Sequence, residues 1–405
     1  MADEWKVVPA RDFCSSVRDG THDSPKPVEV GRRLVTSRHI TGRRLDLSSA
    51  YLISQDDFDE INRRSKVDRW DVLISMIGTV GEPCLISEEP DFSIKNIGLF
   101  KSRGQDEGKY LYYYLQSPQA QQHIREQSRG TTQAYIPLGV LREFPIRVPV
   151  RRELMQAIAC ILGALDDKIE LNRRRNRTLE ALARAIFQSW FVDFDPVKAK
   201  AADFIREGVL EIGDGYRAKI AELAAEGLPF VRAGDLHAGF TLDSVDHLGY
   251  PSVAKAGTKL SRPDDVAFTS KGTVGRIARV DESTPQFVYS PQICYWRSLD
   301  HNALHPSLLY CWMTSEDFLQ QVRAMSGQTD MAPYISLRDQ REILVPRFPE
   351  SQKAIGEKVR HFLSRQALAS IECQTLASLR DTLLPKLVSG ELRVPDAERI
   401  VGRMV

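Results

Sequence analysis

Two stretches of the chain carry apolar residues at every seventh position, which is typical of long coiled-coil helices. The heptad positions, which correspond between the two stretches at a constant offset of 197, are Ile158, Leu165, Asn172, Leu179 and Ile186, and then Ile355, Phe362, Ala369, Leu376 and Leu383. Prolines, which interrupt helical hydrogen bonding, bracket both stretches. They are Pro149 and Pro196 around the first, and Pro349 and Pro385 around the second. The pattern predicts two helices of roughly 35 residues, each about 50 Å long.

The segments between these helices predict mixed globular domains. Short β-branched and aromatic runs, which favour strands, occupy residues 71–77, 92–100, 266–269 and 287–297. Short helices are expected at residues 110–116, 119–127, 308–314 and 318–325. The predicted fold class is α+β, with two repeated mixed α/β domains joined by two long antiparallel coiled-coil helices in pseudo-two-fold symmetry. The expected parts are a domain at 1–150, a central helix at 151–199, a second domain at 200–347, and a C-terminal helix and tail at 348–405.

The two globular segments repeat each other in the same order. The matches include Asp19-Gly20 with Asp214-Gly215, Gly31, Val35 and Ile40 with Gly227, Val231 and Leu236, Asp71-Val72 with Asp265-Val266, Gly78-Thr79-Val80-Gly81 with Gly272-Thr273-Val274-Gly275, and Tyr135-Ile136 with Tyr334-Ile335. Their offsets drift between 194 and 199, as loop insertions would cause. The period is too long for a solenoid. The sequence therefore predicts a duplicated domain.

Composition places the chain among ordinary soluble proteins, with 42% hydrophobic and 27% charged residues and a mean hydropathy of -0.30. No apolar run is long enough to span a membrane, and the start of the chain does not resemble a secretory signal. The six cysteines are scattered, which suits reduced thiols in a cytoplasmic protein. A net charge of only +1 argues against a stand-alone DNA binder, unless another subunit supplies phosphate contacts.

Several motifs together resemble the specificity (S) subunits of type I restriction–modification enzymes, the HsdS family. They lie at residues 19–22, 74–81, 128–137, 144–146, 171–176, 179–180, 189–196 and 384–392, and so cover essentially the whole chain. The resemblance implies two target-recognition domains that bind a bipartite site in double-stranded DNA. It also implies a helical spacer that docks two methyltransferase (M) subunits and a core that restriction/translocase (R) subunits join. In such a phage-defence complex the DNA is methylated at adenine.

Two absences agree with a non-catalytic subunit. An adenine methyltransferase needs an Asn/Asp-Pro-Pro-aromatic loop, and the nearest string, Asp195-Pro196-Val197, lacks the second proline and the aromatic residue. A translocase needs a phosphate-binding loop, and residues 270–275 have its composition in the wrong order. We therefore expect no catalytic residue, metal or cofactor on this chain, with S-adenosylmethionine, ATP and Mg²⁺ on the partner subunits.

Polar loops are the candidate DNA contacts, because arginine and glutamine suit bidentate contacts with guanine and adenine edges. The loop residues are Arg129, Thr131, Gln133 and Tyr135 in the first domain, and Gln328, Thr329 and Tyr334 in the second. Thr21 and His22 are further candidates, although an Asp-Gly turn followed by a surface histidine needs no function. The repeated Gly-Thr-Val-Gly could contact phosphate, but a tight hairpin with positive φ at glycine is favoured.

A basic cluster lies in the middle of the first helix. Arg173, Arg174 and Arg177 face outward by heptad count, whereas Asn172 and Arg175 fall on the seam. Polar seam residues commonly fix the register of a coiled coil. Together with Leu179, these residues are predicted to dock partners and set the register; phosphate contact across the spacer is the alternative.

Two other function classes stay open at this point. Asp91, Glu107 and Lys109 match the pattern of metal-dependent nucleases, although Glu107 and Lys109 run into a predicted helix and the second repeat has no equivalent. A purely structural coiled-coil scaffold would show no sequence preference for DNA.

Overall fold

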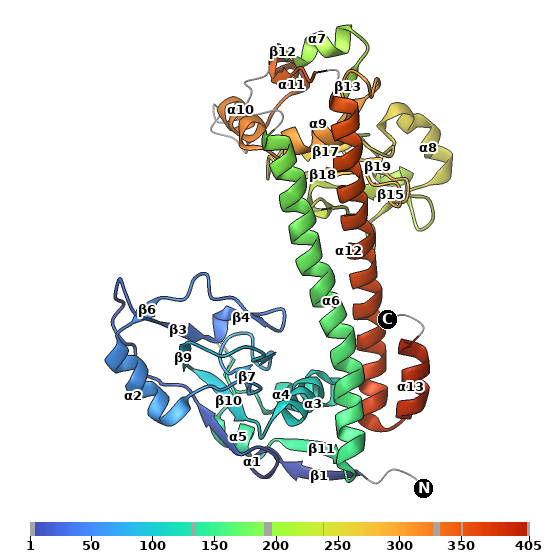
Figure 1. Cartoon of the computed structure of the whole chain (residues 1–405). Coiled ribbons are helices and arrows are strands. Elements are labelled where there is room, and N and C mark those ends of the chain that lie inside the picture. The colour runs from blue at the N-terminus through green and yellow to red at the C-terminus, as the bar shows by residue number, and fades with distance from the viewer. Residues whose placement is uncertain are drawn as a thin grey trace. The chain divides into compact units, whose positions relative to one another are not determined.

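The computed structural model describes residues 5–130, 134–189, 197–237, 239–326, 333–349 and 351–402. The chain divides into two compact units, with residues 1–171 and 372–405 in unit 1 and residues 172–371 in unit 2. The two long helices, α6 (Arg152–Phe187) and α12 (Gln352–Ser389), contribute residues to both units (Figure 1). Unit 1 is therefore discontinuous in sequence, because the last part of the chain folds with the first.

Unit 1 is built on a four-stranded antiparallel sheet in the order β2-β10-β7-β8. These strands are Ser16–Asp19, Ile97–Lys101, Val72–Ser75 and Pro83–Leu85. A second sheet, in the order β6-β3-β9, consists of Leu52–Ile53, Arg32–Thr36 and Phe92–Lys95. Two-stranded sheets join β1 (Trp5–Pro9) to β11 (Pro145–Pro149) and β4 (Ile40–Thr41) to β5 (Arg44–Leu45).

The helices of unit 1 bury their apolar faces against this framework. They are α1 (Ala10–Phe13), the 3₁₀ helix η1 (Ser37–His39), α2 (Gln55–Ser65), α3 (Gln105–Gln116), α4 (Pro118–Gln127), α5 (Leu138–Arg142) and α13 (Val394–Val401). Tyr110 and Leu111 of α3 share a buried cluster with Ile158 of α6 and Leu383 of α12. Apolar burial of this kind is the main favourable contribution to folding.

Unit 2 repeats the same central sheet in the order β13-β20-β17-β18. The strands are Leu210–Asp214, Ile293–Ser298, Val266–Thr269 and Ile277–Arg279. A second sheet, in the order β14-β16-β15-β19, consists of Leu223–Ala224, His247–Leu248, Leu228–Val231 and Val288–Tyr289, and β12 (Lys198–Lys200) pairs with β21 (Leu344–Pro346). The equivalent order in both units confirms the predicted duplication.

The helices of unit 2 follow the same plan. They are α7 (Ala201–Arg206), α8 (Tyr250–Ala256), α9 (Pro306–Met313), α10 (Glu316–Ser326) and α11 (Leu337–Glu342), with 3₁₀ helices η3 (Ile220–Glu222), η4 (Ala233–Asp235) and η5 (Gly257–Lys259). Among the described residues, no helix is both long and apolar enough to cross a membrane.

The two long helices pack antiparallel within each unit. In unit 1 Arg380 Nη1 lies 2.5 Å from Asp166 Oδ1, and Cys373 Sγ lies 3.6 Å from the Ile169 carbonyl oxygen. In unit 2 the Asn176 side-chain amide donates to Ser370 Oγ at 3.1 Å. The mixed fold and the pairing of the two long helices are therefore confirmed, whereas the pseudo-two-fold symmetry stays a prediction.

One predicted helix end is wrong. Pro385 was expected to close the second helix, but it lies inside α12, which continues to Ser389. The proline removes one helical hydrogen bond, at a cost of about 3 kcal/mol in an isolated helix. Leu387 and Val388, on the turn that follows, are both buried in the core of unit 1. Their burial offsets the loss and carries the helix past the proline.

The repeated Asp-Val pair is explained by a buried ion pair at the start of the central strand. Asp71 accepts the Asp68 N–H at 2.7 Å and pairs with Lys101 of β10 at 2.7 Å. In unit 2, Asp265 likewise accepts a backbone N–H, at 2.9 Å, and pairs with Arg297 of β20 at 2.6 Å. The carboxylate recurs because it satisfies the same backbone donor in both sheets, while its cationic partner has diverged.

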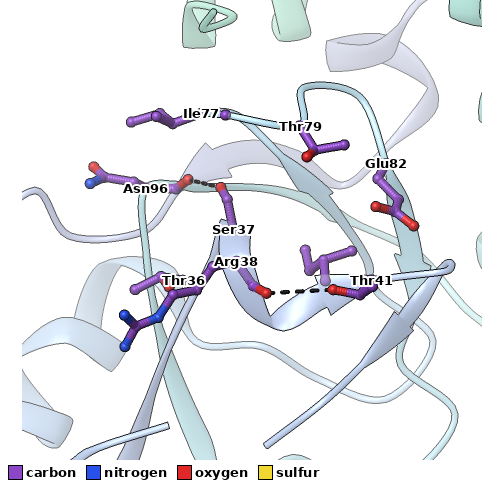
Figure 2. Close-up of a pocket in the computed structure, with 10 residues that line it drawn as sticks. Thr36, Ser37, Arg38, Thr41, Ile77, Thr79, Glu82 and Asn96 are labelled. Carbon is purple, nitrogen blue, oxygen red and sulfur yellow. Dashed lines mark hydrogen bonds between the residues drawn. The ribbon is translucent and has the colours of Figure 1, made fainter. Parts of the chain in front are cut away.

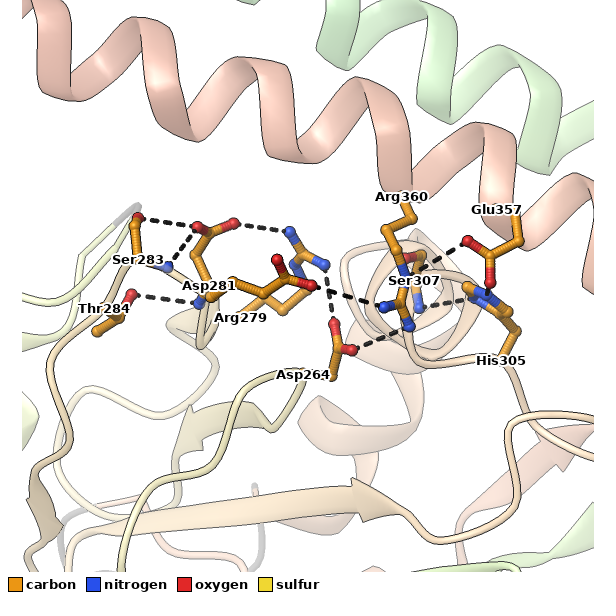
Figure 3. Close-up of polar contacts among 10 residues, drawn as sticks. Asp264, Arg279, Asp281, Ser283, Thr284, His305, Ser307, Glu357 and Arg360 are labelled. Atoms are coloured by element: carbon orange, nitrogen blue, oxygen red, sulfur yellow. Dashed lines mark hydrogen bonds and ion pairs between the residues drawn. The ribbon is translucent and has the colours of Figure 1, made fainter.

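A polar network fastens α12 to the globular part of unit 2 (Figure 3). Arg360 of α12 pairs with Asp264 at 2.9 Å, and Asp264 also pairs with Arg279 at 3.0 Å. His305, at the start of α9, lies with Nε2 3.4 Å from Glu357 Oε1. Gly356 permits this approach, since a Cβ there would lie 2.2 Å from the His305 ring.

Candidate nucleic-acid interface

The Gly-Thr-Val-Gly segments form the turns between the central strands. In unit 1 Gly78 and Gly81 have φ angles of 82° and 90°, and in unit 2 Gly272 and Gly275 have 81° and 97°. Glycine adopts these left-handed conformations without the steric cost that a Cβ imposes. The hairpin interpretation is therefore confirmed in both units.

Each hairpin turn is hydrogen-bonded to the polar loop that the sequence singled out. In unit 1 the Gly78 N–H donates to the Ala134 carbonyl oxygen at 3.0 Å, and Arg129 and Tyr135 exchange two backbone hydrogen bonds of 2.8 Å. In unit 2 the Gly272 N–H donates to the Pro333 carbonyl oxygen at 3.0 Å. Two segments far apart in sequence therefore meet at one edge of the sheet, and this arrangement is built twice.

Tyrosines stand at the same place in both arrangements. Tyr135 is 43% exposed and Tyr334 is 51% exposed, although both belong to backbone bridges with the hairpin turn. A large aromatic side chain held in position yet open to solvent is suited to contact with a partner. The other predicted loop residues, Thr131, Gln133, Gln328 and Thr329, lie outside the described residues.

The Asp-Gly turn is shaped by close backbone approach. A Cβ at Gly20 would lie 2.3 Å from the Ile94 carbonyl oxygen, and a Cβ at Gly215 would lie 2.1 Å from that of Ser290. Neither glycine has a positive φ. These glycines are therefore required by the close approach of the backbone to β9 and to the end of β19, which leaves no room for a Cβ.

Thr21 and His22 follow directly in unit 1. The Thr21 N–H donates to the Ile94 carbonyl oxygen at 3.0 Å, and His22 Nδ1 lies 2.8 Å from Asn96 Oδ1. His22 Nε2 also faces the buried Asp19 carboxylate at 3.1 Å. These contacts place both residues beside Asn96, at the turn between β9 and β10.

A pocket of about 600 Å³ opens between these segments in unit 1 (Figure 2). Its walls are η1 and β4 on one side and the hairpin turn on the other. The lining residues are Thr36, Ser37, Arg38, Ile40, Thr41, Ile77, Gly78, Thr79, Glu82 and Asn96. No sequence motif pointed to a function for residues 36–41, although Val35 and Ile40 recur as Val231 and Leu236.

The basic cluster on α6 is solvent-exposed, as predicted for Arg173, Arg174 and Arg177. Asn172 is 1% exposed, in agreement with its seam position, and Leu179 is half-buried. The seam position of Arg175 is wrong, since this side chain is exposed. With ~3.6 residues per turn, the inward position after Asn172 falls four residues later, on Asn176, which hydrogen-bonds Ser370.

The nuclease pattern does not form a site. Asp91, Glu107 and Lys109 each engage a different partner: Arg33 for Asp91, Arg103 for Glu107 and Asp167 for Lys109. Within the described ranges, no group of three or more histidine, cysteine or acidic side chains is placed to hold a metal ion. The residues that would need to converge on Mg²⁺ are therefore occupied elsewhere.

Comparison with known proteins shows what the chain is similar to. Residues 3–181 match the family described as type I restriction modification DNA specificity domain. The type I restriction enzyme MjaIX specificity subunit of Methanocaldococcus jannaschii is 28% identical over 307 residues, which cover 71% of this chain and 70% of that protein. The HindI specificity subunit of Haemophilus influenzae is 39% identical over 119 residues, 29% of this chain and 24% of that protein.

Residues 3–181 thus carry a type I restriction modification DNA specificity domain, and proteins named as type I specificity subunits resemble the chain over most of its length. Its fold agrees with the crystal structure of a type I S subunit from M. genitalium, at a TM-score of 0.64 over 95% of this chain and 96% of that one, with 16% identity. The predicted non-catalytic role of this specificity subunit is thereby confirmed. The nuclease alternative is not supported, and a specificity role replaces the interpretation as a mere structural scaffold.

Proposed function

We propose that this specificity subunit reads a bipartite site in double-stranded DNA, with residues 1–150 contacting one half-site and residues 200–347 the other. The observation that carries this proposal is the duplicated juxtaposition of hairpin turn and polar loop, held by the Gly78–Ala134 bond in one unit and the Gly272–Pro333 bond in the other. The flanking side chains differ between the units. Two equivalent frames with different side chains suit the recognition of two different short sequences.

The same proposal assigns the chemistry to partner subunits. Two M subunits would dock on the helices and methylate adenine, and R subunits would join that core, with S-adenosylmethionine, ATP and Mg²⁺ bound by these partners. The exposed Arg173, Arg174 and Arg177 on α6 offer a charged docking surface. Phosphate contacts made by the partners would also account for a net charge of only +1 on this chain.

Exchange of one domain tests the division of labour. Residues 1–150 are replaced by the corresponding domain of another family member, and the subunit is assembled with its M subunits. Methylated adenines are then mapped across a genome. We expect one half-site to change and the other to persist. A change in both half-sites, or in neither, would contradict the assignment of one half-site to each domain.

The two exposed tyrosines provide a finer test with a matched control in the same chain. Tyr135→Ala should weaken DNA binding and alter only how the binding constant depends on the first half-site. Tyr334→Ala should alter only its dependence on the second half-site. Loss of a stacking or edge contact typically costs about 1–3 kcal/mol, or roughly 5- to 150-fold in the binding constant. The readout is the binding constant for DNA in which one half-site at a time is altered. If each variant shows the same dependence on both half-sites, the tyrosines do not belong to separate reading surfaces.

A further inference from the structure

The pocket of unit 1 has a frame fixed by hydrogen bonds from three separate segments. Ser37 of η1 is buried, and its Oγ donates to the Asn96 carbonyl oxygen at 2.8 Å. The same Oγ accepts the Met76 N–H at 3.2 Å, which ties η1 to the end of β7. Asn96 itself has a φ of 53°, a left-handed conformation that asparagine adopts more readily than most residues, at the tight turn between β9 and β10. The walls of the pocket are therefore held in place before any ligand arrives.

The pocket is lined by charged side chains of both signs, Arg38 and Glu82. Arg38 is exposed, and no hydrogen bond or ion pair of its guanidinium is found in the part of the chain that the structure describes. Glu82 accepts the Arg43 N–H through Oε1 at 2.7 Å, and among the described residues no hydrogen bond to its Oε2 is found. In Figure 2, Arg38 and Asn96 lie toward one end of the pocket and Glu82 lies at the other.

This combination suits the edge of a base pair better than a phosphate. A carboxylate repels a phosphate group, whereas it accepts a hydrogen bond from the cytosine amino group in the major groove. Arginine donates two parallel hydrogen bonds to O6 and N7 of guanine, the commonest specific contact in protein–DNA complexes. We infer that the pocket of unit 1 reads a guanine-containing base pair from the major groove, with Arg38 as a specificity-determining residue. This inference rests on the proposed function.

Unit 2 has the same frame around a different set of side chains. The Glu82 N–H donates to Ser75 Oγ at 2.9 Å, and in unit 2 the Arg276 N–H donates to Thr269 Oγ1 at 3.0 Å. Arg276 thus replaces Glu82. Its Nη1 lies 3.4 Å from the carbonyl oxygen of Ala233, in the segment that matches η1.

The segment of unit 2 that matches η1 also keeps its backbone geometry and changes a side chain. The backbone N–H of Thr36 donates to the His39 ring, and that of Arg232 donates to the Asp235 carboxylate, both at 2.8 Å. By this correspondence Gly234 stands where unit 1 has Arg38. The arginine therefore lies on the η1 side of the frame in unit 1, as Arg38, and on the hairpin side in unit 2, as Arg276. The two units should therefore prefer different bases.

A randomised half-site library tests the role of Arg38. The full specificity subunit, assembled with its M subunits, methylates DNA in which each base of the first half-site is randomised in turn, and methylated molecules are sequenced. Arg38→Ala should relax the preference for guanine at one base pair by about 5- to 150-fold, and leave the base preferences of the second half-site unchanged. Arg11→Ala is the matched control, since Arg11 is an exposed arginine of the same unit that lies on α1, outside the pocket; it should leave all preferences unchanged.

A lysine variant separates base reading from phosphate contact. Arg38→Lys keeps the positive charge and loses the paired donors, so it should also relax the guanine preference. If Arg38→Lys behaves as the parent, or if Arg38→Ala weakens methylation equally for every sequence, Arg38 contacts the DNA backbone and the inference is wrong. If the parent complex itself shows no preference within either half-site, the proposed function fails instead.

Discussion

The buried ion pair of unit 2 yields a prediction whose size follows from the structure. Arg297 is 4% exposed, and its Nε and Nη2 donate to the Asp265 carboxylate at 2.6 and 2.8 Å. In Arg297→Met, the fully buried carboxylate would keep only the Tyr289 hydroxyl at 3.0 Å and the Arg262 N–H at 2.9 Å. Removing one partner of a buried pair typically costs about 3–5 kcal/mol, because the other charge is left uncompensated. We expect a loss in this range in the free energy of unfolding of unit 2.

Unit 1 supplies the matched control. Lys101 takes the same place, but its side chain is 18% exposed, and Asp71 keeps hydrogen bonds from the N–H groups of Asp68 at 2.7 Å and Ser102 at 3.0 Å. The Asp71 carboxylate is itself buried, but water reaches Lys101 and weakens this pair relative to the Arg297 pair, so Lys101→Met should cost only about 1–3 kcal/mol, in unit 1 alone. Hydrogen exchange of the amides in β17 and β7 measures the opening free energy of each unit separately. Equal losses in the two variants would refute the reasoning from burial.

The loss in Arg297→Met should also depend on pH. Burial raises the pKa of the Asp265 carboxyl above its ordinary value, and the Arg297 guanidinium opposes that rise. Without the guanidinium, the folded-state pKa moves further above the unfolded value of about 3.9. A group with a raised folded-state pKa stabilises the fold below its unfolded pKa, and loses that contribution as the pH rises through the folded-state pKa. The gap between variant and parent should therefore be largest at neutral pH and should narrow toward pH ~4.

Two further outcomes follow from single positions. Gly20→Ala should lower the melting temperature and destabilise unit 1 by about 1–3 kcal/mol or more, because the new Cβ would collide with backbone atoms. Gly139→Ala in α5 is the control, since its Cβ would meet nothing within 4 Å, and it should be neutral or stabilising by about 0.4–1 kcal/mol. Equal effects of the two substitutions would contradict the close backbone approach at Gly20. Burial lowers the pKa of His305, so its contribution to stability is present above the ordinary pKa and is lost as the pH falls through the folded-state pKa. The protection factors of the α9 amides, which correct for the slower intrinsic exchange in acid, should fall below pH ~6.5, and His305→Asn, which keeps an acceptor at the helix start, should reduce that dependence.

The long helices could be predicted because their pattern repeats over many turns. The apolar positions of α6 and α12 define the buried face, and only local details failed. Pro385 does not end α12, because the burial of the following turn outweighs a local signal. Arg175 is exposed, because a helix of ~3.6 residues per turn does not keep a strict seven-residue seam over its whole length.

The candidate interface could be predicted only in part. The hairpin turns follow from their glycines, since positive φ has a sequence signature. The contact of each turn with its distant loop has no sequence signature, because the hydrogen bond between Gly78 and Ala134 depends on how the sheet and α4 pack. Arg38 could not be predicted either, since a single exposed arginine in a short segment forms no sequence pattern. It becomes a candidate only in the folded chain, where η1 and Asn96 form the pocket wall beside it.

The duplication itself separates framework from recognition. Asp71 and Asp265 recur, and both are buried acceptors for a backbone N–H at the start of the central strand. Gly20 and Gly215 recur, and both let a loop lie against a neighbouring strand. A residue that holds the backbone in the same place must be the same in both units, whereas a residue that reads a base must differ if the two half-sites differ. In this chain, the residues that set the base preference of each half-site are therefore to be sought at unmatched positions that the repeated framework holds in place, as we infer for Arg38, whereas repeated residues such as Tyr135 and Tyr334 suit contacts that both half-sites share.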